Sequence, residues 1–175
     1  MAEKVQVTLE GITALLMHRF PLEPIKAIEK KTKEEQAELS AYRTEDGELY
    51  IPGVNIQRAL VQAATYSKGK GRASLQKQAA ACIMVSPEYV LLGKRDYKID
   101  SRGVVVPATK GRIVRHRPRL DEWTVTFVLE YDDTLLSAAQ VRQIVDDMGS
   151  KVGLLDFRPA CKGPFGRSTV IEWKK

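Results

Sequence analysis

The sequence WTVTFVLEY, Trp123 to Tyr131, constrains the fold of this chain more than any other stretch. Its apolar residues occupy every second position, which in an extended strand places them on one face: Trp123, Val125, Phe127 and Leu129. The N-terminal sequence KVQVTLEGITALLMH alternates in the same way before it becomes continuously apolar. We therefore expect two strands that each bury one face in a core.

The basic sequence KGRIVRHRPRL, which precedes Trp123, predicts a strand that pairs with residues 123–131. Pro118 has no N–H to donate to a ladder, so we expect it in the turn between the two strands. The sequence RSTVIEW near the C-terminus predicts a last strand.

Three helices are expected between these strands. The first follows Pro52 and Gly53, and its apolar residues lie along one broad side: Val54, Ile56, Leu60, Val61 and Ala64. A short alanine-rich helix is expected within residues 73–84.

The third helix has the clearest boundaries. Ser137 is a good N-cap, Gln140 completes a capping box, and Leu136 can pack against Val141 as a hydrophobic staple. The inward stripe consists of Val141, Ile144, Val145 and Met148, and Gly149 is the expected C-terminal stop.

Stripped of its excursions, the chain has the element order strand, helix, strand, strand, helix, strand. This order predicts an α+β fold of the ferredoxin-like (RRM-like) split β-α-β type. Both helices then cover one face of an antiparallel sheet. We expect a single domain, residues 1–175, with excursions at 20–48 and 85–108, the second a hairpin. The Lys- and Glu-rich part of the first excursion suits either an exposed helix or a mobile loop.

Composition bounds the classes of function. The chain of 175 residues has a formal net charge of +6, which favours anionic partners. Cys82 and Cys161 suit reduced thiols in a cytoplasmic protein, and no secretion signal or membrane span is evident. The cysteines, His18 and His116 lack zinc-ligand spacing, and no phosphate-loop or dinucleotide motif occurs, so we expect neither metal nor cofactor.

The segment GLLDFRPACKGPFGRSTVIEW, residues 153–173, is the first candidate binding site. Glycines allow a close backbone approach, exposed amides with positive neighbours can hold phosphate oxygens, and Phe165 can stack on a base. The residues involved are Arg158, Lys162, Gly163, Phe165, Gly166 and Arg167. Alternatively, the glycines serve only a tight turn and the aromatic rings cap the core.

A second basic cluster lies nearby in the sequence: Lys110, Arg112, Arg115, Arg117 and Arg119. Alternate residues of a strand share a side, so the last three predict a row of arginines facing one way. Such a row suits a phosphate backbone, unless internal carboxylates such as Asp121 offset it. A flexible loop adds Lys68, Lys70 and Arg72.

His18 is the one candidate for catalysis, as a general base in RNA cleavage, although a lone histidine is more often structural. No acid or base partner for it can be named from the sequence. We therefore expect a protein that is not an enzyme.

These residues together resemble the RAMP superfamily, the RRM-like proteins that include the backbone subunits and RNA-processing nucleases of CRISPR systems. The resemblance rests on the element order, on YIPGVNIQRAL (Tyr50 to Leu60) and on GPFGRSTV before the last strand. The chain is also similar to small phage and prophage proteins that share LLMH, a basic strand with RP, and DFRP followed by GPFGR.

The resemblance implies binding of RNA or single-stranded DNA by subunits that assemble side by side, as a homo-oligomer or within a ribonucleoprotein. By position, Gly163, Gly166 and Arg167 match the family's glycine loop, and Pro52, Gly53 and Asn55 match its helix entry. The leading hypothesis is a sequence-tolerant single-stranded nucleic-acid-binding protein. The alternatives are a metal-independent RNA endonuclease that uses His18 and a phage-encoded protein-interaction or inhibitor module.

Overall fold

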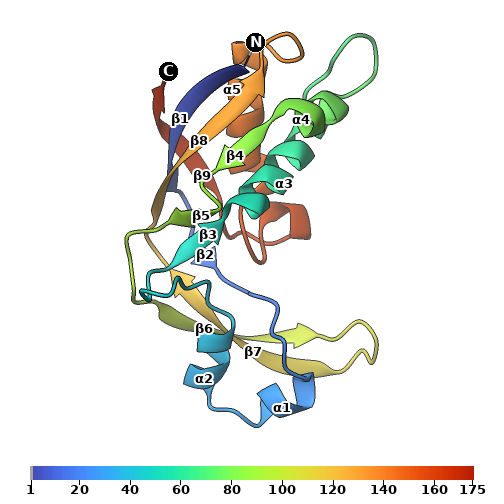
Figure 1. Cartoon of the computed structure of the whole chain (residues 1–175). Coiled ribbons are helices and arrows are strands. Elements are labelled where there is room, and N and C mark those ends of the chain that lie inside the picture. Colours follow the sequence, from blue (N-terminus) through green and yellow to red (C-terminus); the bar gives the residue numbers. More distant parts are fainter. Residues whose placement is uncertain (1) are drawn as a thin grey trace.

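The computed structural model describes residues 2–175 and shows an α+β protein built on a four-stranded antiparallel sheet (Figure 1). The strands lie in the order β4 (Met84–Ser86), β8 (Thr124–Asp132), β1 (Ala2–Gly11) and β9 (Ser168–Lys174). The two predicted strands with one apolar face are confirmed as β1 and β8, which pair with Val7 opposite Phe127 and Leu9 opposite Val125. These apolar side chains are buried.

Helices α3 (Gly53–Ala63), α4 (Gln76–Cys82) and α5 (Ala138–Asp147) pack on the apolar face of this sheet (Figure 1). The apolar stripe of α5 and its capping box between Ser137 and Gln140 are both confirmed. A 3₁₀ turn, η1 (Ala64–Tyr66), extends α3. The core of the molecule lies between this helical layer and the sheet.

Two details of the helices differ from expectation. Val54 is 57% exposed, and the buried side of α3 is completed by Ala59 and Ala63, because the small residues let the helix lie close to its neighbours. The chain does not stop at Gly149 but continues into a π-helical turn, η2 (Met148–Val152), which ends at Gly153 with φ of 74°. Gly149 is required by packing, since a Cβ there would lie 2.3 Å from the Ser168 carbonyl oxygen.

The second face of the four-stranded sheet is polar. Thr8 and Thr126 share a hydrogen bond of 2.9 Å across β1 and β8, and Lys4 pairs with Glu130 on the same two strands at 3.2 Å. Among the described residues, none with an aromatic side chain stands in register with this set. This face therefore lacks the rings on which bases would stack.

The four-stranded sheet and the helices α3, α4 and α5 form a first lobe, and a second sheet forms a second lobe beside it (Figure 1). Its strands are β2 (Leu15–Leu16), β7 (Arg112–Leu120) and β6 (Lys98–Val105), in that order. Helices α1 (Ile25–Glu29) and α2 (Lys33–Leu39) lie along it, and α2 has a capping box between Thr32 and Glu35. The Lys- and Glu-rich segment is thus helical at residues 33–39, the first of the two alternatives.

Short elements join the two lobes. β3 (Tyr50–Pro52) pairs with β5 (Tyr89–Leu91) and leads directly into α3. A 3₁₀ turn, η3 (Pro159–Cys161), lies in the connection between η2 and β9. No helix within residues 2–175 combines the length and the apolar character that a membrane span requires.

The strand pairing predicted for the basic segment is wrong. β7 does not pair with β8 but with β6, and Pro118 lies inside β7, opposite Ile99. Pro118 lies just beyond the last pair that β2 makes with β7, Leu16 with Arg119, and its carbonyl oxygen still accepts a hydrogen bond of 3.0 Å from the Met17 amide. The basic strand consequently belongs to the second sheet and not to the four-stranded one.

Candidate functional site

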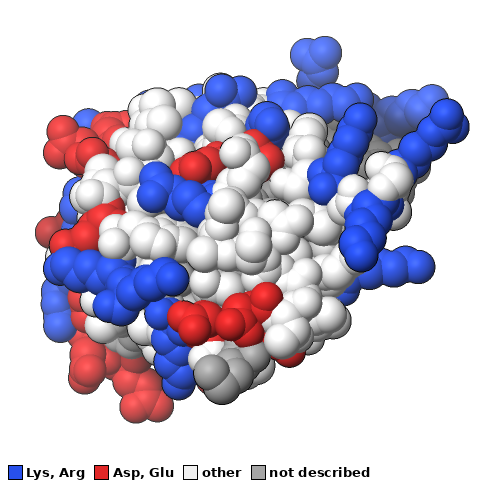
Figure 2. Space-filling view, turned by 90° about the horizontal axis from the view of Figure 1, so that it is seen from above, with Lys and Arg blue, Asp and Glu red and all other residues white. Residues whose placement is uncertain are grey.

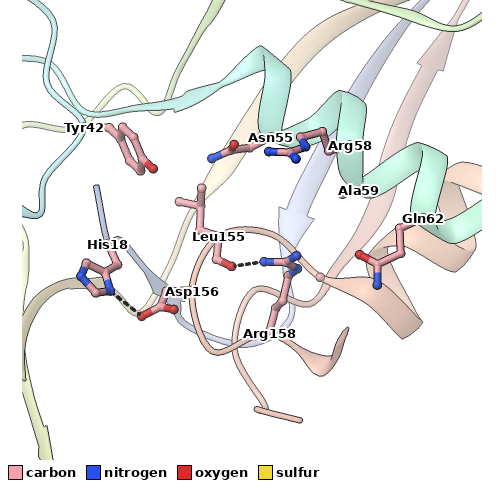
Figure 3. Close-up of a pocket in the computed structure, with 10 residues that line it drawn as sticks. His18, Tyr42, Asn55, Arg58, Ala59, Gln62, Leu155, Asp156 and Arg158 are labelled. Atoms are coloured by element: carbon pink, nitrogen blue, oxygen red, sulfur yellow. Dashed lines mark hydrogen bonds and ion pairs between the residues drawn. The ribbon is translucent and has the colours of Figure 1, made fainter. Parts of the chain in front are cut away.

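A polar cavity of about 510 Å³ lies between α3 and the segment that follows η2 (Figure 3). Asn55, Arg58 and Gln62 project into it from α3, because positions three and four residues apart share one side of a helix. Arg158 faces them from the other wall and donates a hydrogen bond of 2.9 Å to the Leu155 carbonyl oxygen. The Nε atom of Arg158 is buried and has no partner within residues 2–175.

At one end of this cavity His18 lies beside Asp156, with 3.6 Å between Nδ1 and Oδ2, and the two form an ion pair when His18 is protonated (Figure 3). The Arg117 guanidinium, from β7, bonds the same carboxylate. Burial of Asp156 disfavours its charged form, but the hydrogen bond with His18 and the charge of Arg117 outweigh burial and lower the pKa of Asp156 to about 2. Asp156 is therefore ionised at neutral pH.

A second cavity, of about 600 Å³, lies on the other side of this ion pair. The polar residues that line it are His18, Asp156, Arg102, Arg115 and Arg117. Apolar residues of the β6–β7 hairpin, of α1 and of residues 153–167 before β9, which we call the late loop, also line it: Val104, Val105, Val106, Pro107, Ile25 and Phe157. Since His18 and Asp156 line both cavities, the two adjoin, and together we call them the central cleft.

The glycines of the late loop are explained by internal packing. A Cβ on Gly163 would lie 2.0 Å from the Phe157 carbonyl oxygen, and one on Gly166 would lie 2.1 Å from the Leu154 carbonyl oxygen. Gly166 also has φ of 75°, which only glycine adopts easily. Both glycines are buried, so their backbone does not face an open site.

Phe165 is only 6% exposed and packs with Ala14, Leu16 and Phe157 in a small core of its own. The guanidinium groups of Arg102 and Arg119 lie over its ring, 4.7 and 5.4 Å from the centroid. The alternative in which this ring caps the core therefore describes it better than the alternative in which it stacks on a base.

The row of arginines on β7 has unequal surroundings. Arg117 is 5% exposed and is paired with Asp156, while Arg119 pairs with Asp121 and Asp100. Internal carboxylates thus offset two of the three charges. Arg115 has no ion-pair partner within residues 2–175 and lines the second cavity.

The structure brings some predicted residues to the central cleft and leaves others away from it. Arg115, Arg117, Arg158 and Asn55 line it. The following are exposed but line neither cavity: Lys68, Lys70, Arg72, Lys110, Arg112, Lys162 and Arg167. Pro52 is the N-cap residue of α3, and Gly53 packs against the chain, since a Cβ there would lie 2.5 Å from the Pro87 carbonyl oxygen.

The exposed cations are not evenly distributed. Figure 2 looks down on the end of the molecule that carries α4, and Lys and Arg crowd one side of this end while Asp and Glu lie mainly toward the other. In Figure 1 the loop of Lys68, Lys70 and Arg72 projects toward that basic side, as does the tip of the β6–β7 hairpin.

Several residues of the central cleft were missed from the sequence, notably Arg58, Gln62, Tyr42 and Asp156. The spacing of Asn55, Arg58 and Gln62 was an available signal, because it marks a polar side on an otherwise apolar helix. No sequence signal connects Asp156 to His18, 138 positions away in number. In the described part of the chain, no group of three or more His, Cys, Asp or Glu residues is placed to hold a metal ion.

Comparison with models of protein families finds none that matches this chain, and comparison with curated proteins finds no significantly similar sequence.

Proposed function

We propose that the protein binds single-stranded nucleic acid in the central cleft. The observation that carries this proposal is that three separate segments bring cations to two adjoining cavities. Arg58 comes from α3, Arg158 from the late loop, and Arg115 from the β6–β7 hairpin. A polyanion can give one partner to cations spread along adjoining cavities.

The chemistry of the walls favours a single strand over a duplex. Arginines bind phosphates, and the apolar residues that line the second cavity can contact bases, which a duplex keeps inside its stack. Since phosphate contacts carry no sequence information, the binding is tolerant of sequence. Asp156 is already paired with Arg117 and His18, so its charge is compensated within the protein.

We further propose that the four-stranded sheet with α3 and α5 is a ferredoxin-like split β-α-β unit of RAMP type. Supporting this, β1, α3, β4, β8, α5 and β9 follow one another in the chain and the strands lie in the order β4, β8, β1, β9. The second sheet is then built from two insertions, β2 with α1 and α2 between β1 and α3, and β6 with β7 between β4 and β8. In this proposal the ligand lies at the boundary of these insertions, and not on the open sheet face.

Fluorescence anisotropy of a labelled single strand over a series of salt concentrations tests nucleic-acid binding. We expect the affinity to fall steeply between 50 and 200 mM salt, by about 10³-fold for six phosphate contacts. The variant Arg58→Gln with Arg115→Gln should bind more weakly at every sequence and reduce the salt slope by about 2.

The control removes one positive charge outside the cleft, and it is compared with Arg58→Gln and Arg115→Gln taken singly, each of which removes one charge within the cleft. Lys77→Gln alters an exposed residue of α4 that lines neither cavity, and should leave the slope within experimental error of the parent's. Absence of binding at 50 mM salt, or equal effects of the cleft and control substitutions, would contradict the proposal.

A second function is favoured by one observation, the 3.6 Å approach of His18 Nδ1 to Asp156 Oδ2 inside a cationic cavity. A carboxylate that orients an imidazole is the arrangement of a general base, and the 2′-hydroxyl of RNA would be the nucleophile. Incubation of single-stranded RNA with the protein and a metal chelator tests it. Cleavage that is lost in His18→Ala would support a metal-independent endonuclease, whereas intact RNA would exclude it under those conditions.

A further inference from the structure

We infer that Arg102 and Arg115 form a subsite for a phosphate monoester, the group that ends a phosphorylated strand. The inference rests on the proposed function, because both residues line the second cavity of the central cleft. It adds a specificity for strand ends. A monoester carries a charge of about −1.5 to −2 and three acceptor oxygens, whereas a phosphodiester inside a strand carries one negative charge.

The first observation is a pair of like charges. Arg102 of β6 stands directly opposite Arg115 of β7, so the two side chains project from the same face of the hairpin. Like charges in directly opposite positions destabilise a sheet. An anion bound between the two guanidinium groups would remove this repulsion, and the second cavity gives it access to both.

The second observation is the charge balance of this face of the hairpin. Five cations project from it, and within residues 2–175 the carboxylates that pair with them number three. The cations are Lys98, Arg102, Arg115, Arg117 and Arg119, and the carboxylates are Asp100, Asp121 and Asp156. Two positive charges are therefore left uncompensated, and one phosphate monoester neutralises about that charge.

The third observation is that one guanidinium is already held in place. The Nε of Arg102 donates a hydrogen bond of 2.8 Å to the buried carboxylate of Asp100, and the group lies over the Phe165 ring, 4.7 Å from its centroid. These contacts fix its plane but leave its two Nη groups without a hydrogen-bond partner in the described chain. The guanidinium is therefore oriented before a ligand arrives, and its Nη donors suit a phosphate.

The second arginine of the pair is available as a whole. Arg115 has no ion-pair partner within residues 2–175, whereas its neighbour Arg117 already bonds Asp156. A carboxylate side chain or an internal phosphodiester brings one negative charge and would leave one arginine of the pair uncompensated. The monoester is the anion that matches both.

The test measures the anisotropy of a labelled strand of about twelve nucleotides that is phosphorylated at its 5′ or its 3′ end. The reference is a hydroxyl-terminated strand two nucleotides longer, which carries about the same total charge. The parent protein should prefer one of the phosphorylated strands by about tenfold, because hydrogen bonds between charged groups are strong. Arg115→Gln should bind this strand and the reference equally.

Arg112→Gln is the matched control. Arg112 lies on the same strand but stands opposite Val105 on the other face of the hairpin, and it lines neither cavity. This variant should keep the preference of the parent. Thermal unfolding at low salt without ligand checks the fold of Arg115→Gln, and its midpoint should equal or exceed the parent's because a like-charge pair is removed. A midpoint well below the parent's would contradict the repulsion and overturn the subsite.

The outcomes separate the subsite from the proposed function. A preference that persists in Arg115→Gln, or that the parent lacks although it binds the strands, would overturn the subsite and leave the proposed function standing. If the parent binds no strand, thermal unfolding with inorganic phosphate at constant ionic strength decides. A rise in the midpoint that Arg115→Gln lacks would assign the subsite to a free monoester and overturn the proposed function alone, whereas no rise would overturn both.

Discussion

At the scale of single residues, a glycine of the late loop is required by internal packing and backbone conformation. Gly166 lies directly against the Leu154 backbone and has a positive φ. Its amide also donates to the Ala14 carbonyl oxygen at 2.8 Å, which ties the loop to the N-terminal segment. The loop therefore positions Asp156 and Arg158 through packing that leaves no room at this residue.

We predict that Gly166→Ala destabilises the protein by at least about 2 kcal/mol, because the added methyl group meets backbone and the left-handed conformation is strained. Urea unfolding followed by circular dichroism measures the effect. Gly71→Ala is the matched control, since Gly71 also has a positive φ but has no neighbour within 4 Å of a Cβ. Equal losses in the two variants would show that packing contributes nothing.

The ionised carboxylate of Asp156, in the late loop, pairs with Arg117 of the second sheet. Its pKa falls from an ordinary 3.8 to about 2 in the folded protein, so the stabilisation is complete above about pH 4 and is lost as the pH falls toward 2. We predict that Asp156→Asn lowers the free energy of unfolding at pH 7 by at least about 2 kcal/mol.

The same substitution should flatten the dependence of stability on pH between 4 and 2, and unfolding curves collected over that range would show it. Asp146→Asn is the control, because Asp146 pairs with Arg142 on the surface of α5 at 3.2 Å. An unchanged acid limb in Asp156→Asn would mean that the ion pair with Arg117 contributes no stability.

At the scale of elements, local sequence patterns predicted helices and strands correctly, whereas the pairing of the basic strand was predicted wrongly. The capping box of α5 and the alternation in β1 and β8 were identified from neighbouring residues alone, and the structure confirms them. The partner of the basic strand was not identified correctly. Pairing with β6 and pairing with β8 satisfy the same local pattern, and the choice between them depends on the fold.

The N-cap of α5 allows a quantitative test. Ser137→Ala removes the side-chain acceptor for the Gln140 amide, and we predict a loss of about 1 kcal/mol in the free energy of unfolding. Ser74→Ala is the control, because the contact of Ser74 Oγ with the Gln76 amide has nearly the same length, 3.4 Å against 3.3 Å at Ser137, but lies outside a capping box. Equal losses would show that the capping box of α5 adds nothing to a weak local contact.

At the scale of the whole molecule, some arginines form ion pairs within the protein and others have no such partner in residues 2–175. Arg117 and Arg119 are neutralised within the protein and hold the second sheet to the late loop, whereas Arg58 and Arg115 have no ion-pair partner in residues 2–175. The net charge of +6 therefore does not show which cations are left without an ion-pair partner or where they lie. Those in the central cleft carry the proposed function.

If the four-stranded sheet is a unit of RAMP type, as proposed, protomers are expected to assemble side by side on a strand. We expect the mass of the complex, measured by light scattering, to rise in steps of one protomer as the oligonucleotide is lengthened. The Lys77→Gln variant should show the same steps as the parent. A single protomer bound to a strand several sites long would contradict assembly while leaving binding itself intact.

The sequence alone determined the features that depend on neighbours in the chain: the alternating strands, the capped helix and an α+β composition. It also identified His18, Asn55, Arg115, Arg117 and Arg158, all of which line the central cleft. These features could be predicted because periodicity and capping are local properties of the backbone.

Only the tertiary structure decided which of the predicted site residues remain available. It placed the arginine strand in a second sheet, buried Phe165 and the late glycines, and joined Asp156 to His18 and Arg117. The physical reason is that burial and ion pairing depend on contacts between segments far apart in the chain. Residues of the same type, such as Arg115 and Arg117, acquire different roles through those contacts alone.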